Sequence, residues 1–192
     1  ITDVKGLEVI EWGMLNFDGP EKIMKSPALL MKIFEESARL KIPLSAEARR
    51  LVKEFSHFVD KAYRNSEPVV KSFERILVAP APKFDVLNEM LNTGFLEKII
   101  PEFHSVRNRI QYDEYHRYPV DKHLLRTVQT VKKLGSAKDS GLDPLYEKIY
   151  RNLRLKRLLL WAALLHDIGK GRDEDHSILG AQIARKVAPR LG

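Results

Sequence analysis

A histidine and an aspartate stand side by side, as His166-Asp167, at the end of the apolar segment from Leu155 to Ile168. The segment is apolar on nearly every side of a helix, a pattern that predicts a buried helix. Burying an ionised carboxylate beside an imidazole is costly unless another charge compensates it. Imidazole and carboxylate together suit a divalent cation, so the pair predicts a metal site. A capped helix end, with a satisfied histidine and a solvated aspartate, is the structural alternative.

Two further histidines lie where predicted helices border a core. His123 is near the start of a helix expected from Asp121 to Gly135, beside an apolar stripe made of Val120, Leu124, Val128 and Val131. His176 opens the last predicted helix, and Gly180 follows one turn later, where a glycine permits close helix approach. With Asp167, these histidines could surround a cation from three helices. A histidine at a helix start with a packing glycine is the alternative for His176.

The turn after the His-Asp pair carries two cationic side chains, Lys170 and Arg172. Gly169 and Gly171 allow the backbone to turn tightly there. The two cations could bind an anionic phosphate, and a solvated turn is the alternative.

The other histidines are weaker candidates for metal ligands. His116 precedes Pro119 and is predicted to contact substrate, while His57 is expected to be structural and His104 to lie in a loop.

Several kinds of chemistry are excluded by what the sequence lacks. It has no cysteine, which rules out disulfides, thiolate nucleophiles and zinc sites built on cysteine, and which fits a cytoplasmic protein. It has neither a G-x-S-x-G elbow nor a glycine-rich phosphate loop. Asp173 and Asp175 form a D-x-D pair, but no strand and Gly-Ser turn precede them, so a nucleotidyltransferase metal site is rejected.

The net charge of +7 favours anionic partners, although a solvated basic surface explains it equally well. The basic clusters alternate with apolar residues at helical spacing and lack interleaved aromatic residues, which makes nucleic-acid binding unlikely. No apolar run approaches the roughly 18 residues of a membrane span.

Apolar residues recur at helical spacing almost throughout, which predicts an all-α fold. Ser45, Asp143 and Asp175 are expected N-caps, and helices should end at Ala79-Pro80 and near Val187. No strand is predicted. We expect a multi-helical linker bundle over residues 1–110 and the first part of a second helical domain over 111–192, where nearly all candidate site residues lie.

Three segments carry a resemblance: YHRYPVDKH (115–123), LLHDIGKGR (164–172) and DHSILGAQ (175–182). His123, followed by His166-Asp167 and Lys170, resembles the HD phosphohydrolase superfamily. The surrounding residues resemble, more narrowly, the bifunctional uridylyltransferase/uridylyl-removing enzymes of the bacterial P-II nitrogen-signalling system. MLNTGFLEKIIPEF (90–103) is similar to the helical region before the HD domain of that family. The resemblance is clear from about residue 70 onward and looser before it.

The resemblance implies a metal-dependent phosphodiesterase that releases UMP from a tyrosine of uridylylated P-II. It implies His123, His166 and Asp167 as ligands of one or two divalent ions (Mn, Mg, Fe or Zn). His176 would serve a second ion or the leaving phosphate, and Lys170 would contact the phosphodiester. Glutamine regulation and nucleotidyl transfer would belong to other domains of such an enzyme.

The family pattern departs from this sequence in two ways. It continues with a further His and a closing Asp, so we expect an incomplete HD domain that is inactive by itself. The family also usually has Glu and Thr where this chain has Lys122 and Leu124. Two alternatives remain: another HD hydrolase acting on a nucleotide or an RNA end, and a non-catalytic helical module that docks P-II.

Overall fold

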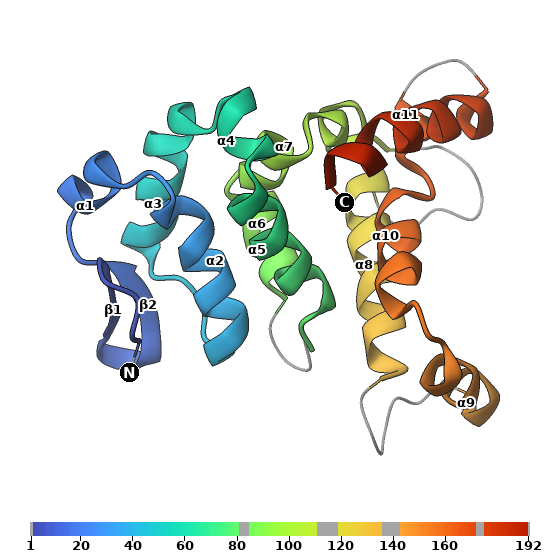
Figure 1. Cartoon of the computed structure of the whole chain (residues 1–192), viewed down its shortest axis with the longest axis horizontal. Coiled ribbons are helices and arrows are strands. Elements are labelled where there is room, and N and C mark those ends of the chain that lie inside the picture. The colour runs from blue at the N-terminus through green and yellow to red at the C-terminus, as the bar shows by residue number, and fades with distance from the viewer. Residues whose placement is uncertain (1, 81–84, 111–118, 136–142, 172–174, 192) are drawn as a thin grey trace. The chain divides into compact units, whose positions relative to one another are not determined.

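The computed structural model describes residues 2–80, 85–110, 119–135, 143–171 and 175–191 (Figure 1). The chain divides into two compact units, Ile1–Ile99 and Ile100–Gly192. The predicted helical class is confirmed, with one small sheet in addition. The boundary between the two compact units lies about ten residues before the domain boundary expected near residue 110. The expected domain boundary stays a prediction.

The first unit begins with an antiparallel hairpin of strands β1 (Leu7–Ile10) and β2 (Met14–Phe17). The expectation that the sequence contains no strand was therefore wrong here. Each strand has only four residues, too few to establish a visible alternation. The connection lacks the Asn-Gly signal of a tight hairpin. Instead, Trp12 adopts a φ of 70° and is 91% exposed at the turn.

Helices form the rest of the first unit. They are α1 (Pro20–Lys25), α2 (Leu29–Leu40), α3 (Ala46–Glu54), α4 (Lys61–Asn65), α5 (Glu67–Val78), α6 (Val86–Asn92) and α7 (Phe95–Ile99), with a 3₁₀ turn η2 (Phe55–Phe58) after α3. The predicted cap is confirmed, since the Ser45 hydroxyl accepts a hydrogen bond from the Ala48 amide at 2.8 Å. The sheet is joined to this cap because the Ser45 amide donates to the Leu15 carbonyl at 2.8 Å.

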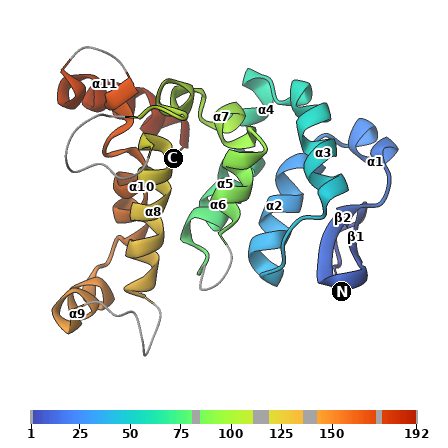
Figure 2. The same cartoon turned by 180° about the vertical axis from the view of Figure 1, so that it is seen from behind.

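The core of the first unit lies between the apolar faces of α2 and α5 and the helices beside them. Phe34 of α2 and Phe95 of α7 are fully buried, with ring centroids 4.9 Å apart. Figure 2 shows α2, α5 and α6 of this unit from the reverse side.

The second unit contains a 3₁₀ turn η3 (Pro101–Val106), α8 (Val120–Lys133), α9 (Pro144–Asn152), α10 (Lys156–Leu165), a 3₁₀ turn η4 (Ile168–Gly171) and α11 (His176–Leu191). Helices α8 and α10 lie side by side in both views (Figures 1 and 2), and η4 contacts η3 and α11. The caps predicted at Asp143 and Asp175 are confirmed, because their carboxylates accept hydrogen bonds from Leu145 and Ser177 amides.

Two expectations for this unit were wrong. Helix α10 is not buried all round: Leu160, Ala163 and Leu164 face the core, whereas Leu158 is 51% exposed. One neighbouring helix can cover only one side of α10 among the described residues, however apolar its sequence. The other correction concerns α11, which continues through Pro189 instead of ending near Val187. A proline so close to a helix end removes only one internal hydrogen bond. None of the helices described is both long and apolar enough to cross a membrane.

Candidate metal centre

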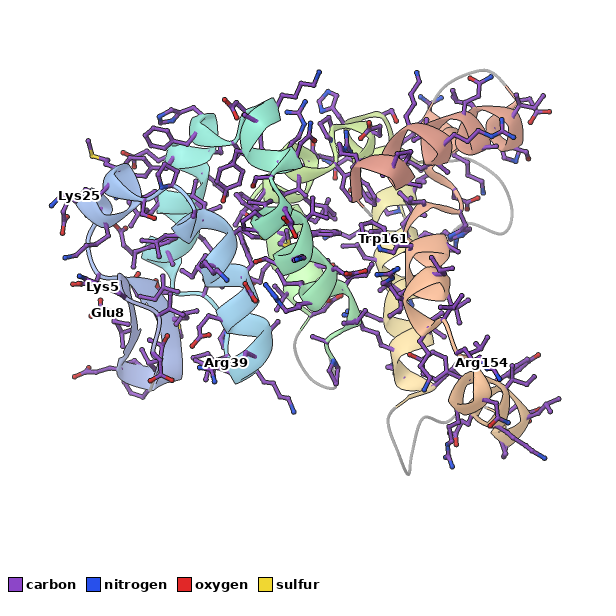
Figure 3. All side chains as sticks on the ribbon, viewed as in Figure 1. Lys5, Glu8, Lys25, Arg39, Arg154 and Trp161 are labelled. Atoms are coloured by element: carbon purple, nitrogen blue, oxygen red, sulfur yellow. The ribbon has the colours of Figure 1, made fainter. Side chains whose placement is uncertain are left out.

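Helices α8 and α10 bring together residues that are 43 positions apart in the sequence. Buried Leu124 and Val128 of α8 pack in the core that also contains Leu160 and Leu164 of α10. Figure 3 labels Trp161 on α10, about one turn before the end of the helix. This packing places His123, in the first turn of α8, against the carboxyl end of α10.

Three potential ligand atoms form a nearly equilateral triangle at this end. His123 Nε2 lies 3.2 Å from His166 Nε2 and 3.5 Å from Asp167 Oδ2, and His166 Nε2 lies 3.4 Å from the same oxygen. A tetrahedral ion with bonds of about 2.0–2.1 Å separates neighbouring ligands by roughly 3.3–3.4 Å. The triangle therefore has the size of one face of such a coordination shell.

The His166 ring is oriented by the helix that carries it. Its Nδ1 lies 2.9 Å from the Ala163 carbonyl oxygen. Because a carbonyl can only accept, Nδ1 holds the proton and Nε2 of the neutral ring presents a lone pair to the triangle. A second hydrogen bond of this kind is the usual support of a metal-binding histidine. This contribution of Ala163 could not be predicted from the sequence, since a backbone carbonyl leaves no signal in residue type.

The exposure of the three side chains gives the site an open side. The His123 and His166 side chains are each 37% exposed, while that of Asp167 is 16% exposed. The carboxylate thus lies at the inner corner, and the imidazoles form the rim. An ion held here would keep coordination positions open toward solvent, as catalytic metal sites do. In the part of the chain that is described, these residues are the one group of three with ligand atoms close enough to share an ion.

Lys170 lies at the same corner. Turn η4 begins directly after Asp167, and the Lys170 amide donates to the Asp167 carbonyl oxygen at 3.0 Å. This turn brings Lys170 Nζ to 3.0 Å from Asp167 Oδ2, with only 13% of the lysine side chain exposed. An ammonium group therefore lies beside the Asp167 carboxylate, and the contact of Lys170 with a phosphate stays a prediction.

His176 is close to the turn but outside the triangle. It is exposed at the start of α11, and its ring does not belong to the described ligand group. Its backbone lies against Gly169, because a Cβ placed on Gly169 would come within 2.1 Å of the His176 carbonyl oxygen and 2.6 Å of the Gly180 nitrogen. The predicted close approach is present at Gly180, but it depends on Gly169, since a Cβ on Gly180 would meet its nearest neighbour at an ordinary 3.6 Å.

The remaining predicted residues divide between described and undescribed parts. Arg172 and His116, predicted to bind substrate, lie outside the described residues. His57 lies in η2, where its Nδ1 is 2.9 Å from the Glu54 carbonyl oxygen, in keeping with a structural role. His104 is exposed in η3, not in an irregular loop.

The sequence indicates Asp121 only as the start of a helix, but the structure shows it buried two residues before His123. Asp121 is 1% exposed, and its carboxylate accepts hydrogen bonds from the Asn108 amide at 3.0 Å and the Lys122 amide at 2.8 Å. It therefore anchors the chain around Asn108 to the first turn of α8, two residues before His123. An acidic residue in a first helical turn was the available signal.

Comparison with known proteins gives two findings. The HD domain family matches residues 120–192. Bifunctional uridylyltransferase/uridylyl-removing enzymes match nearly the whole chain. The protein of this name from Ruegeria pomeroyi is 36% identical over 98% of the chain, which corresponds to 21% of that protein. Those from Novosphingobium aromaticivorans and Cereibacter sphaeroides are 32% and 36% identical over 95% and 94% of the chain. The chain thus spans about a fifth of the length of these relatives.

Proposed function

We propose that the chain supplies the hydrolytic metal centre of a bifunctional uridylyltransferase/uridylyl-removing enzyme. It carries an HD domain and is related to such enzymes over nearly its whole length. The proposed reaction is hydrolysis of the phosphodiester that joins UMP to a tyrosine of the P-II signalling protein. The triangle formed by His123, His166 and Asp167 is the observation that supports a metal-dependent mechanism.

His123, His166 and Asp167 would hold the ion. Two imidazole ligands favour Zn, Mn or Fe over Mg, an ion that prefers sites made only of oxygen ligands. A divalent ion held there would activate a water molecule and offset negative charge on the phosphoryl group. The hydrogen bond with the Ala163 carbonyl would leave Nε2 of His166 available to such an ion, and Asp167 would supply the least exposed ligand.

Lys170 would bind the phosphoryl oxygens as charge builds up during bond cleavage. Its ammonium group reaches the corner of the triangle on the short turn η4, so it needs no long loop to enter the site. His176, at the start of α11, would contact the phosphate of the released UMP. The phenolate released from the tyrosine is a better leaving group than an alkoxide, because its conjugate acid has a pKa of about 10.

The test uses the full-length protein that contains this chain and uridylylated P-II, with release of UMP followed at several concentrations of Mn²⁺ or Zn²⁺. Asp167→Asn should remove both metal binding and UMP release. Asp143→Asn is the matched control, since asparagine also caps helices and α9 lacks a predicted ligand. Retention of the wild-type rate by a folded Asp167→Asn protein would refute the proposal.

The same preparation separates the alternatives. Hydrolysis of a 2′,3′-cyclic nucleotide, without release of UMP from P-II, would indicate a different HD hydrolase. Binding of P-II by a protein that holds no metal would indicate a docking module.

A further inference from the structure

One carboxylate oxygen of the site serves every polar partner described around it. Asp167 Oδ2 is 3.0 Å from Lys170 Nζ, 3.4 Å from His166 Nε2 and 3.5 Å from His123 Nε2. The ammonium of Lys170 is thus the positive charge that balances this oxygen when the imidazoles are neutral. A carboxylate with so little exposure needs such a partner, because burial without one is costly.

An ion at the centre of the triangle would approach the same oxygen from the side of the two imidazoles. Its distance to Oδ2 would be about 2 Å, shorter than any ion pair with an ammonium group. The ion and the ammonium carry charges of the same sign and would lie within a few ångströms of each other in a partly buried site. Their repulsion is weakly screened there, so the ion weakens the bond between Lys170 and Asp167.

We infer that Lys170 and the divalent ion are alternative counterions of Asp167, so that metal loading releases the Lys170 ammonium for the phosphoryl group of the substrate. The inference rests on the proposed function and adds a regulatory step to it. Before metal binds, Lys170 is held by Asp167 and attracts phosphate poorly. After metal binds, Lys170 can turn from Asp167 to the phosphoryl oxygens.

The position of Lys170 makes such a change feasible. It follows Asp167 by three residues on η4, and its long side chain has several rotatable bonds between the backbone and Nζ. A small rotation moves Nζ away from Oδ2 without moving the turn. The backbone hydrogen bond from the Lys170 amide to the Asp167 carbonyl can stay in place throughout.

Amine labelling of the full-length protein tests the exchange without measuring catalysis. Lysine acylation is followed peptide by peptide by mass spectrometry, with and without Zn²⁺. We expect the labelling rate of Lys170 to rise several-fold when Zn²⁺ is added. In Asp167→Asn, Lys170 should be labelled rapidly at all Zn²⁺ concentrations. Lys71, which forms an exposed ion pair with Glu67 in the first unit, is the internal reference and should not change.

Calorimetric titration with Zn²⁺ gives a second, independent readout. Lys170→Gln should bind Zn²⁺ about tenfold more tightly than wild type, because the competing charge is removed, whereas Lys170→Arg should not. Wild-type protein that binds Zn²⁺ with no change in labelling at Lys170, or Lys170→Gln with unchanged affinity, would overturn the exchange alone. Absence of Zn²⁺ binding in wild type would overturn the proposed function together with it.

Discussion

Both units contain a carboxylate with little exposure, and the two are satisfied in different ways. In the first unit, Glu35 accepts hydrogen bonds from Lys32 and Ser72 and pairs with Arg75 at 2.6 Å. These partners come from α2 itself and α5, so donors and charges balance within the fold. In the second unit, Asp167 faces imidazole nitrogens, one of which presents a lone pair. The first arrangement is complete without a ligand, whereas the second adds two imidazoles to the ion pair of Asp167 and Lys170 and so offers a potential place for a metal ion.

Apolar side chains show a parallel contrast. The largest fully buried side chains include four phenylalanines of the first unit, Phe17, Phe34, Phe73 and Phe95, and one of the second, Phe103. In the second unit, several large apolar residues of α9 and α10, among them Leu145 and Leu158, are more than half exposed. The large buried aromatic side chains therefore lie mainly in the first unit, whereas the candidate metal ligands lie in the second.

The largest expected effect is a loss of stability in the first unit. Phe34→Ala should destabilise the first unit by about 3–5 kcal/mol, since it removes a fully buried ring from the core. Zn²⁺ titration should remain close to that of wild type, because the ligands lie in the other unit. Phe103→Ala is the matched variant in the second unit and should lower Zn²⁺ affinity, since η3 packs against η4.

Calorimetric titration and thermal unfolding followed by circular dichroism measure both effects. Equal loss of Zn²⁺ affinity in the two variants would contradict the expectation that metal binding depends on the second unit and not on the core of the first.

The next largest effect is expected at Gly169 in the second unit. Gly169→Ala would place a Cβ 2.1 Å from the His176 carbonyl oxygen, so η4 and the start of α11 must move apart. We expect a cost of about 1–3 kcal/mol in the free energy of unfolding, together with weaker Zn²⁺ binding.

Gly180→Ala is the matched control on the other side of the same contact. Its Cβ would find its nearest neighbour, the Gly169 nitrogen, at 3.6 Å, which is ordinary contact. Alanine is also favoured over glycine within a helix by up to about 1 kcal/mol, so this variant should be neutral or more stable. Denaturant unfolding of both variants decides, and equal destabilisation would contradict the close approach at Gly169.

The smallest effect concerns the pH dependence of stability and the hydrogen bonds and ion pairs around Glu35 in the first unit. Burial raises the pKa of Glu35, but hydrogen bonds from Lys32 and Ser72 and the charges of Lys32 and Arg75 outweigh it and lower the pKa. A lowered pKa in the folded state stabilises the protein above the unfolded value of about 4.3, and this contribution is lost as pH falls further. Glu35→Gln should therefore make unfolding less sensitive to acid below about pH 4.3.

Glu47→Gln provides the exposed comparison. The Arg50 hydrogen bond lowers the pKa of Glu47, but the carboxylate is 51% exposed and solvent screens the pair. Its replacement should change the acid limb of the unfolding curve less than Glu35→Gln does. The measurement is chemical denaturation at a series of pH values between neutrality and pH 3. A larger change for Glu47→Gln would contradict the greater contribution expected from the interactions of Glu35.

Helix positions and the members of the candidate site could be predicted from the sequence because both depend on residue type at regular spacing. Ser45, Asp143 and Asp175 cap the predicted helices for that reason. His123 and His166-Asp167 were selected by their chemistry and their places at helix ends, and their roles as ligands stay predictions.

Features that depend on neighbours or on the backbone could not be predicted in the same way. The short β1–β2 hairpin has no alternation to detect, and the Ala163 carbonyl that orients His166 could belong to any residue. The exposure of Leu158 on α10 reflects how many elements pack against the helix, which its own composition does not encode. The position of Lys170 Nζ beside Asp167 likewise follows from the tightness of η4.

The exposed Trp12 at the hairpin turn has a practical consequence. The sequence contains two tryptophans, Trp12 in the first unit and Trp161 on α10 in the second. Replacing Trp12 by phenylalanine removes a fluorophore that is surrounded almost entirely by water. Within these 192 residues, the remaining tryptophan is then Trp161 on α10, the helix that ends directly before His166, and it provides an intrinsic optical probe of that helix without attached dyes.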